Sequence, residues 1–256
     1  MKDKEVWRLL DLEHENPFLN LAIEEATARI VGRGATPNTV RFWRNKNAVI
    51  VGYSQSAEFE VNFEACREYG TAIGRRFTGG GAVYHDLGNL NFSIFVSKAH
   101  RLITSDLSET FRTLASAVVE GLKTLGLNIV HEPLNTFQVN GQKICGAAGS
   151  LRSGFVLYHG SILVDSNLNV LSKVLDPEAG SPQKKGVPSN KKDVANISTL
   201  LGRNLSIQEV KIVLKMGFES NFRIKLEAGK LTREEESLAQ QLLKEKYSTD
   251  AWNFKR

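Results

Sequence analysis

The chain has 256 residues and a formal net charge of +5, with 41% hydrophobic and 24% charged residues. This composition is typical of a globular protein, and the length suffices for one large domain or a large domain with a small appendage. The sequence contains no run of about 20 uncharged apolar residues, so it predicts no membrane-spanning helix and no membrane partner. Its two cysteines lack metal-like spacing and its first residues lack an apolar leader, which argues against a zinc site or a disulfide framework and favours the cytoplasm.

The basic excess is modest, with 33 Lys and Arg residues against 28 Asp and Glu residues. A basic surface serves either nucleic acid or other anions, such as nucleotide phosphates and acidic protein partners. The sequence has neither an RNA-binding aromatic motif nor zinc-finger spacing, so we expect no nucleic-acid partner.

The first half of the chain alternates between predicted strands and helices. Asn16 before Pro17 is typical of a helix start, and apolar residues at helical spacing extend this helix to about residue 31. Two apolar, β-rich runs at 39–44 and 48–53, joined by three polar residues, predict a β-hairpin. The other elements expected before residue 130 are strands at 6–12, 71–77, 82–84 and 91–97 and helices at 62–69 and 106–125.

The middle of the chain contains its strongest short hairpin signal. Asn140-Gly141 lies between apolar runs at 137–139 and 142–145, which predicts two strands joined by a tight turn. A further strand is expected at 155–164. Residues 176–193 are basic and rich in proline and glycine, which indicates a loop.

The C-terminal part contains two capping boxes, in which a Ser or Thr and a Glu three residues later satisfy the first N–H groups of a helix. These pairs are Ser206 with Glu209 and Thr232 with Glu235. The mixture of hairpins and helices predicts an α+β fold with a mixed or antiparallel sheet and packed helices. We expect a main domain over residues 1–200 and a short helical α/β appendage over 201–256 that packs on it.

Residues 75–89, RRFTGGGAVYHDLGN, are the most informative segment of the sequence. Three consecutive glycines let the backbone approach a ligand closely and direct its N–H groups to one point, which suits a phosphate. Arg75 and Arg76 add charge, and arginine grips phosphate or carboxylate with two donors at once. The segment is neither a P-loop nor a dinucleotide fingerprint. A glycine-rich turn in a β-hairpin is the structural alternative.

The whole of segment 75–89 resembles the signature of the lipoate–protein ligase family, within the biotin/lipoate ligase superfamily. The resemblance implies that Arg76 contacts nucleotide phosphates and that the loop after it lines an ATP site. It also implies that Thr78 and His85 border an acyl pocket, although a purely structural role is an equal alternative for His85. The loop residues implied in nucleotide binding are Gly79, Gly80, Gly81, Ala82, Val83 and Tyr84.

Lys143 follows the predicted hairpin turn and precedes a run of small residues. An ammonium near the reacting atoms can neutralise the charge that develops when a carboxylate attacks the α-phosphate of ATP. A solvated lysine is the structural alternative, because lysine is mostly exposed. The run that begins at Lys143 resembles the family's K-[IV]-x-G-x-A segment, which implies that Lys143 is the catalytic residue and also contacts the nucleotide.

The same alignment implies further site residues. Asn135 matches a nucleotide-binding position, and Gly146, Ala148 and His159 match positions that contact the acyl substrate. Thr136 departs from the family, which usually has Asp at this position. If that Asp arranges magnesium or the phosphates, its absence weakens adenylation.

A second departure is Cys145, where the family often has Ser or another small residue. A cysteine two residues from a lysine can act as a nucleophile if its pKa is lowered. This leaves an alternative function, an octanoyl- or lipoyl-transferase that uses Cys145 to take the acyl group from acyl carrier protein without ATP. Packing is the structural alternative, because a free cysteine usually behaves as a small buried hydrophobe.

The reaction that the resemblance implies is ATP-dependent activation of lipoate to lipoyl-AMP and transfer to a lysine of an acceptor lipoyl domain, either in a 2-oxoacid dehydrogenase E2 or in the glycine-cleavage H protein. ATP and Mg2+ are the implied cofactors, and no metal ligands are expected among the side chains. Lys185 lies in a segment that resembles the loop folding over the adenylate, although a solvated linker is the alternative. The C-terminal residues resemble the catalytic subunit of archaeal two-part ligases, which implies a separate small accessory subunit and no accessory domain in this chain.

Overall fold

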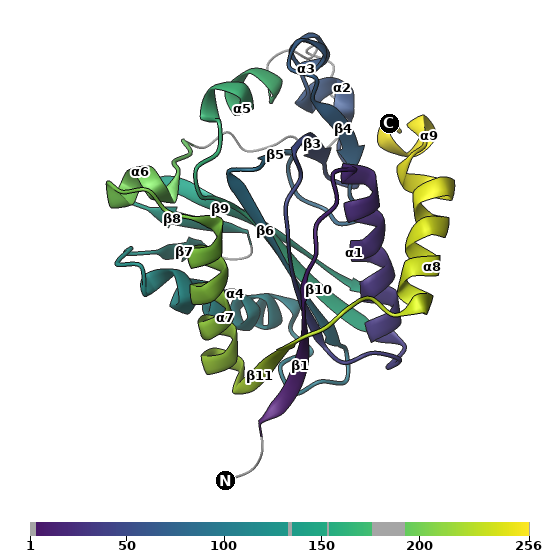
Figure 1. Ribbon diagram of the computed structural model, residues 1–256, viewed down its shortest axis with the longest axis vertical. Helices are drawn as coiled ribbons and strands as arrows, with labels where there is room; N and C mark the ends of the chain where they lie inside the picture. The colour runs from purple at the N-terminus through teal and green to yellow at the C-terminus, as the bar shows by residue number, and fades with distance from the viewer. Residues whose placement is uncertain (1–3, 133–134, 153, 176–192, 256) are drawn as a thin grey trace.

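The structure of the protein, a computed structural model, describes residues 4–132, 135–152, 154–175 and 193–255 (Figure 1). Two β-sheets lie at its centre and helices pack around them (Figure 1). The α+β class predicted from the sequence is confirmed. In the described part of the chain, no helix is long and apolar enough to cross a membrane.

The larger sheet is mixed. Among the described residues its strands are, in spatial order, β11 (Ile224–Ala228), β1 (Glu5–Asp11), β2 (Thr39–Trp43), β6 (Asn89–Ser97), β10 (Phe155–Leu163), β9 (Gln142–Arg152), β8 (Thr136–Val139) and β7 (Val130–Glu132). β11 and β2 pair parallel with β1, and all other neighbours are antiparallel. The predicted hairpin at Asn140-Gly141 is confirmed as the β8–β9 turn, where both residues have positive φ angles of 51° and 79°.

The smaller sheet consists of β4 (Ala72–Arg75), β3 (Asn47–Val51) and β5 (Val83–Asp86) in that order. β3 pairs parallel with β4 and antiparallel with β5. The predicted hairpin between 39–44 and 48–53 is therefore wrong, because β2 pairs with β1 and β6 instead. Both strands are buried along nearly their whole length, so side chains on both faces of each strand must be covered. This is met by placing β2 inside the larger sheet and β3 inside the smaller one.

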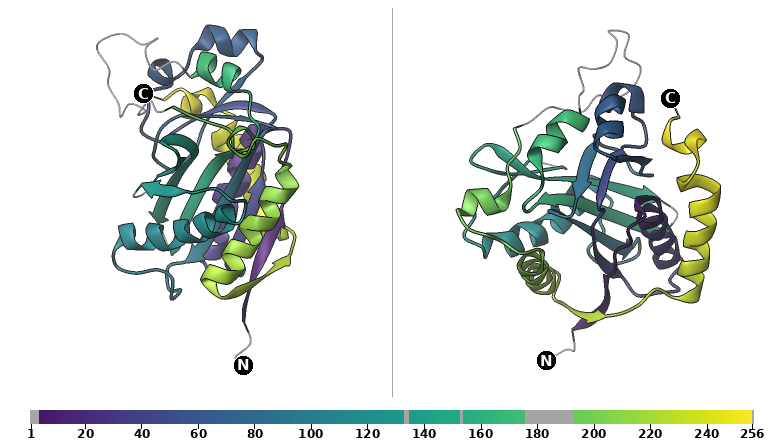
Figure 2. Two further views of the ribbon diagram at one scale, coloured as in Figure 1. Left: turned by 90° about the vertical axis from the view of Figure 1, so that its left-hand side faces the viewer. Right: turned by 45° about the horizontal axis from the view of Figure 1, so that its top comes forward.

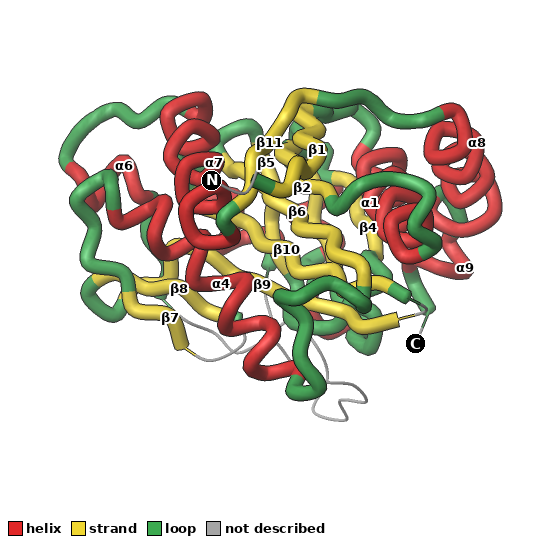
Figure 3. The backbone as a smooth tube through the Cα atoms, turned by 90° about the horizontal axis from the view of Figure 1, so that it is seen from below, coloured by secondary structure: helices red, strands yellow, loops and turns green. Residues whose placement is uncertain are grey.

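Helices cover both faces of the larger sheet (Figures 2 and 3). The helices of the described residues are α1 (Pro17–Gly32), α2 (Ala57–Glu60), α3 (Phe63–Glu68), α4 (Leu107–Lys123), α5 (Leu168–Val174), α6 (Ile197–Leu201), α7 (Ile207–Phe222), α8 (Arg233–Leu242), the π-helical turn η1 (Leu243–Tyr247) and α9 (Asp250–Asn253). Of these, α2, α3 and α5 pack against the smaller sheet. Alternate residues of β6 point to opposite faces. Phe92 and Ile94 join the core with α4 and α7, whereas Phe95 packs on α1.

The C-terminal residues contribute directly to the sheet and its core. β11 adds a parallel edge strand to β1, and Phe218 and Phe222 of α7 are buried in the core that α4 shares. Both predicted capping boxes are confirmed at the starts of α7 and α8. Arg8 on β1 donates two hydrogen bonds to Glu235, at 2.5 and 2.7 Å, which fixes α8 to the sheet. The division of the chain at residue 200 stays a prediction.

Candidate active site

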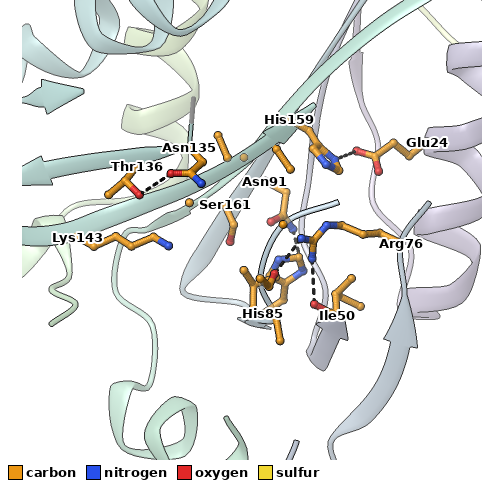
Figure 4. Close-up of a pocket in the computed structure, with 18 of the residues that line it drawn as sticks. Glu24, Ile50, Arg76, His85, Asn91, Asn135, Thr136, Lys143, His159 and Ser161 are labelled. Atoms are coloured by element: carbon orange, nitrogen blue, oxygen red, sulfur yellow. Dashed lines mark hydrogen bonds and ion pairs between the residues drawn. The ribbon is translucent and has the colours of Figure 1, made fainter. Parts of the chain in front are cut away.

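A cavity of about 250 Å³ lies where the two sheets meet, beside α1 (Figure 4). Its walls come from α1, from β3 and β5 of the smaller sheet, from β2 and β6–β10 of the larger sheet, and from the loop between β4 and β5. Lys143, Asn135 and Thr136 lie at one end, and Glu24 and His159 lie at the other (Figure 4).

The glycine-rich loop wraps around the guanidinium of Arg76. This group donates to the carbonyl oxygens of Ile50 at 3.1 Å, Gly79 at 2.6 Å and Gly81 at 2.8 Å. Burial lowers the pKa of Arg76 to about 10, so the side chain is still cationic near neutral pH. Gly80 has a φ of 89°, a conformation that favours glycine. Arg76 thus holds the loop in shape, and its contact with phosphate stays a prediction.

A chain of buried polar side chains closes the end of the cavity remote from Lys143. Nδ1 of His159 donates to Oε1 of Glu24 at 2.8 Å, and its Nε2 lies 2.8 Å from the hydroxyl of Thr78. Ser93 donates to the same oxygen of Glu24 at 2.6 Å. Burial opposes ionisation of Glu24, but the charge and hydrogen bond of His159 and the hydrogen bond of Ser93 hold its pKa below the usual value. Glu24 is therefore an anion that orients His159.

His85 is neutral and lines the same end of the cavity. Its Nδ1 accepts from the amide of Asn45 at 3.1 Å, so the ring proton is on Nε2. Burial and the charge of Arg76 lower the pKa of His85 to about 3. Nε2 of His85, Oδ1 of Asn91 and Oε2 of Glu24 are buried without a hydrogen-bond partner among the described residues. All three residues line the cavity. Because buried polar atoms are normally hydrogen-bonded, one donor and two acceptors beside the cavity lack the usual partner.

Apolar side chains complete this end of the cavity. Leu21, Trp43 and Ile50 line it together with His85. The Trp43 ring packs edge-on against His85 with 5.9 Å between ring centroids, and its indole N–H donates to Ser93 at 3.0 Å. This end therefore suits a flexible alkyl chain that carries a weakly polar terminus.

Lys143 lies on β9 at the opposite end, just after the β8–β9 turn. The backbone N–H of Lys143 donates to the carbonyl of Asp193 at 2.8 Å, and the backbone carbonyl of Lys143 accepts from the N–H of Ala195 at 3.0 Å. These bonds fix the backbone of Lys143 on both sides. A Cβ at position 146 would lie 3.0 Å from Nζ of Lys143, so Gly146 leaves room for the ammonium.

Asn135 and Thr136 lie beside Lys143 on the cavity wall. The hydroxyl of Thr136 donates to Oδ1 of Asn135 at 3.1 Å, which orients the amide. The carbonyl of Asn135 accepts from the N–H of Ala147 at 2.8 Å and so connects this turn to β9. Position 136 therefore presents a neutral hydroxyl in place of the Asp expected from the resemblance, and this hydroxyl orients Asn135.

Both cysteines of the chain belong to the described residues, and neither lines the cavity. Cys145 has no exposed surface and packs in the core beneath α4, where burial raises its pKa to about 12. Cys66 packs in the smaller core around α3, where burial raises its pKa to about 11. A thiolate nucleophile is therefore unfavourable at either position.

Most of the predicted site residues that the structure describes come together in the cavity. Those that line it are Arg76, Gly80, Gly81, Ala82, Val83, His85, Asn135, Lys143, Gly146, Ala148 and His159. Thr78 and Gly79 lie behind this lining and contact His159 and Arg76. Tyr84 packs instead with α2, α3 and α5, where burial raises its pKa to about 12. Lys185 lies outside the described residues.

Several lining residues gave weak signals in the sequence. Glu24 lies in the helix that starts at Pro17, among positions that are almost all buried. A buried acidic residue needs a polar partner, so an acidic residue on an otherwise apolar helix face was the one sequence signal for Glu24. Trp43 and Asn91 lie on strands whose apolar pattern predicts packing alone.

Residues 16–219 match the family model described as the lipoyl protein ligase A/B catalytic domain. The chain belongs to this family. It is therefore an enzyme of the family that contains lipoate ligases and octanoyltransferases. Lipoate-protein ligase A subunit 1 of Thermoplasma acidophilum is 40% identical over 258 residues, with 96% of each chain covered. Octanoyltransferase LipM of Anoxybacillus flavithermus is 32% identical over 278 residues, covering 99% of this chain and all of that protein.

Solved structures of lipoate ligases have the same fold as this family member. The bi-partite lipoate protein ligase of Thermoplasma acidophilum, studied together with its E2 lipoyl domain, superposes with a TM-score of 0.84 at 37% identity, covering 98% of this chain and 96% of that chain. A lipoate-protein ligase A bound with ATP gives a TM-score of 0.83 at 37% identity, covering 96% and 98%. Both ligases and octanoyltransferases are thus similar over nearly the whole chain, and the chemistry of the cavity must distinguish between the two activities.

Proposed function

We propose that this protein is an ATP-dependent lipoate–protein ligase, which activates lipoate as lipoyl-AMP and transfers the lipoyl group to a lysine of a lipoyl domain. One observation favours this activity over cysteine-dependent transfer. The side chain of Lys143 lines the cavity, whereas both thiols are buried elsewhere with raised pKa values. Adenylation needs a cation near the α-phosphate and needs no thiol.

In the first step the carboxylate of lipoate attacks the α-phosphorus of ATP, and the bond to the pyrophosphate oxygen breaks. Lys143 stabilises the negative charge on the α-phosphoryl oxygens as this exchange proceeds. The backbone N–H groups of the glycine-rich loop and the amide of Asn135 hold the nucleotide. The ATP-bound relative supports this use of ATP.

In the second step the neutral amine of the acceptor lysine attacks the acyl carbon of lipoyl-AMP. The acyl–phosphate bond breaks, AMP leaves with the electron pair, and the new amide loses its extra proton to solvent. The ammonium of Lys143 stabilises the charge that returns to the leaving phosphate. One cation at one position thus serves both steps.

The lipoyl chain runs from Lys143 toward Glu24 in this proposal. Leu21, Trp43 and Ile50 provide apolar contact for its methylene groups. The sulfur-containing ring lies beside neutral His85, whose buried Nε2 has no hydrogen-bond partner among the described residues. The cavity therefore places the carboxylate of lipoate near the cation and its apolar ring away from it.

Magnesium belongs to the proposal as the companion of the triphosphate, whose charge it neutralises. Among the described residues, no group of three or more His, Cys, Asp and Glu side chains is placed to hold a metal ion. Phosphate oxygens are the usual main ligands of such an ion, so the chain need not supply a dedicated site. The protein itself contributes the positive charges of Lys143 and Arg76.

A small second subunit is also part of the proposal. The relative from Thermoplasma acidophilum is subunit 1 of a ligase described as bi-partite. Because this chain covers 96% of that subunit, we infer that it also works with a separate small partner. An increase in lipoyl-AMP formation when the partner is added would support this inference.

Formation of lipoyl-AMP tests the proposed activity. The protein is incubated with lipoate and Mg·ATP without an acceptor, and pyrophosphate and lipoyl hydroxamate are measured. Removing the cation with Lys143→Ala should slow adenylation by about 10²- to 10³-fold, the usual effect of losing one transition-state charge contact. Lys98→Ala, an exposed lysine, and Cys145→Ala are controls that should keep wild-type rates. Adenylation that survives in Lys143→Ala would contradict the assigned role.

A further inference from the structure

A cluster of cations and aromatic rings lies where the C-terminal segment meets the start of the glycine-rich loop. This basic aromatic cluster consists of Arg152, Lys246, Lys255, Tyr53, Phe77 and Trp252. The ammonium of Lys255 lies 3.5 Å from the ring centroid of Tyr53 and 4.0 Å from that of Trp252. Cζ of Arg152 lies 5.5 Å from the Tyr53 ring and 5.7 Å from the Phe77 ring. Arg152 is exposed, and 40% of Tyr53 is exposed, so the cluster reaches the surface.

The cluster is held in one geometry by Arg75 on β4. The guanidinium of Arg75 donates to the carbonyls of Gly52 at 2.8 Å, Asn253 at 3.0 Å and Lys255 at 2.9 Å. In return, the indole N–H of Trp252 donates to the carbonyl of Arg75 at 2.8 Å. A surface fixed in this way loses little conformational entropy when a partner binds.

Arg152 and Lys255 give the cluster a net positive charge, since the charge of Lys246 is balanced by Glu25. Nζ of Lys246 lies 4.0 Å from the Trp252 ring and pairs with Glu25 at 2.6 Å. Burial, followed by the charges of Arg75, Lys246 and Arg152, lowers the pKa of Lys255 to about 8. Burial is the first cause of the lowering, and repulsion by the neighbouring cations adds to it. A carboxylate brought to this surface would relieve that repulsion.

The cluster lies behind the glycine-rich loop that lines the cavity. The Phe77 ring faces Arg152, while the next residue, Thr78, contacts His159 at the end of the cavity. In the segment that follows β3, the backbone N–H of Tyr53 donates to the carbonyl of Thr78 at 2.8 Å. The preceding glycine is packed so closely that a Cβ at position 52 would lie 2.0 Å from the carbonyl oxygen of Gly80. A protein seated on the cluster therefore lies beside the glycine-rich loop.

We propose that the basic aromatic cluster is the docking surface for the acceptor protein, which it binds through carboxylates that flank the lysine to be lipoylated. This inference rests on the proposed ligase function. Tyr, Trp and Arg are the side chains most enriched among residues that dominate binding energy, and all three are present here. The charge favours an acidic acceptor surface, and the aromatic rings provide apolar contact area.

The dimensions of a small acceptor domain fit this arrangement. Arg152 follows Lys143, beside which the acyl carbon lies in the proposed reaction, by nine residues on β9, which corresponds to about 30 Å along an extended strand. A domain of about 80 residues has a radius of gyration of about 12 Å, so it is about 30 Å across and reaches from the cluster to Lys143. The acceptor can therefore contact the cluster while its lysine enters the cavity.

Charge reversal tests the docking surface. Transfer from lipoate and ATP, both saturating, to an apo E2 lipoyl domain is measured for Arg152→Glu and Lys255→Glu. Lys244→Glu is the matched control, since it makes the same charge change in the same C-terminal segment, at an exposed lysine outside the cluster. Each cluster variant should raise the acceptor KM by about tenfold, as expected for an interfacial charge pair turned repulsive. The control should match the wild type.

Lipoyl-AMP formation without acceptor separates docking from chemistry. We expect it to be unchanged in both cluster variants, because neither residue lines the cavity. An unchanged acceptor KM, or an equal loss of lipoyl-AMP formation, would overturn the docking inference. A wild-type protein that forms no lipoyl-AMP even with the small partner subunit present would overturn the ligase proposal itself, and with it this inference, before any variant is compared.

A pH series gives a second readout. Lys255 faces the charges of Arg75, Arg152 and Lys246, and its ammonium is lost as the pH rises through about 8. The advantage of the wild type over Lys255→Gln in acceptor KM should therefore be largest near pH 7 and disappear by pH 9.5. An advantage that stays constant across this range would contradict a charge-based contact.

Discussion

Single polar side chains define the closed end of the cavity. Glu24, His85 and Asn91 each have a buried polar atom without a partner among the described residues. Leaving such an atom unpaired costs about 1–3 kcal/mol, so packing alone does not account for three of them in one cavity. In the proposed ligase, bound substrate or water supplies the missing hydrogen bonds. We therefore regard these atoms as part of the binding site.

The neutrality of His85 leads to a prediction about stability and pH. Its pKa is about 3 in the folded protein and 6.5 in the unfolded chain, so between these values the unfolded state binds more protons. The contribution of His85 to stability is thus complete above pH 6.5 and is lost as the pH falls below it. From pH 7 to pH 5 the wild type should lose about 2 kcal/mol more than His85→Gln in free energy of unfolding. Urea titrations at both pH values measure this difference, and equal losses would contradict it.

At the residue scale, the sequence predicted site residues where a suitable side-chain chemistry coincides with a specific motif. Lys143 and the glycine-rich loop could be predicted because their residue types and order are unusual and match a known family. The internal bonding of Arg76 and the burial of Tyr84 in another core could not, since both depend on how the loop closes. The partnership of Glu24 with His159 joins residues 135 positions apart, which no local pattern reports.

Close approach between elements depends on a few glycines. Gly217 of α7 faces α4, and a Cβ there would lie 2.4 Å from the carbonyl oxygen of Ala117 and 2.6 Å from the backbone nitrogen of Gly121. Because these are backbone atoms, neither can move without separating the helices. The contact explains why a glycine, normally unfavourable inside a helix, is present in the middle of α7.

Gly217→Ala tests this helix contact. In an exposed helix the change would stabilise the protein, but here we expect it to destabilise the fold by about 1–3 kcal/mol through overpacking. Met216→Ala is the control, since Met216 is the adjacent residue and is 56% exposed. It should change stability by less than about 0.5 kcal/mol. Thermal unfolding of both variants decides the matter, and a Gly217→Ala protein as stable as the wild type would show that α4 and α7 do not pack this closely.

Elements with local signals were predicted more reliably than their pairing. The Asn140-Gly141 turn and both capping boxes are fixed by residues within a few positions of one another. The supposed hairpin of 39–44 with 48–53 failed because strand pairing is decided by burial on both faces. β2 and β3 each enter a separate sheet, and the polar residues between them carry the chain across.

The whole molecule creates the site at the junction of its two sheets. The smaller sheet supplies Ile50, Val83 and His85, and the larger sheet supplies Lys143 and His159. The α+β class could be predicted from the mixture of elements, and the family from the two motifs. The junction itself could not, because it depends on the order of strands from distant parts of the chain. Cys145 is an example. Lys143, two residues away in the sequence, suggests a reactive thiolate, but burial of Cys145 in the core raises the pKa of its thiol and makes the thiolate unfavourable.

The most direct test of the ligase activity uses a protein without thiols. The Cys66→Ala/Cys145→Ala variant, once thermal unfolding shows that it is folded, is incubated with lipoate and an apo E2 lipoyl domain, with and without ATP, and separately with octanoyl acyl carrier protein. Intact mass of the acceptor domain is the readout. We predict an ATP-dependent gain of one lipoyl group at the wild-type rate. Wild-type transfer from the carrier protein without ATP that is lost in the variant would contradict the ligase and establish a cysteine-dependent transferase.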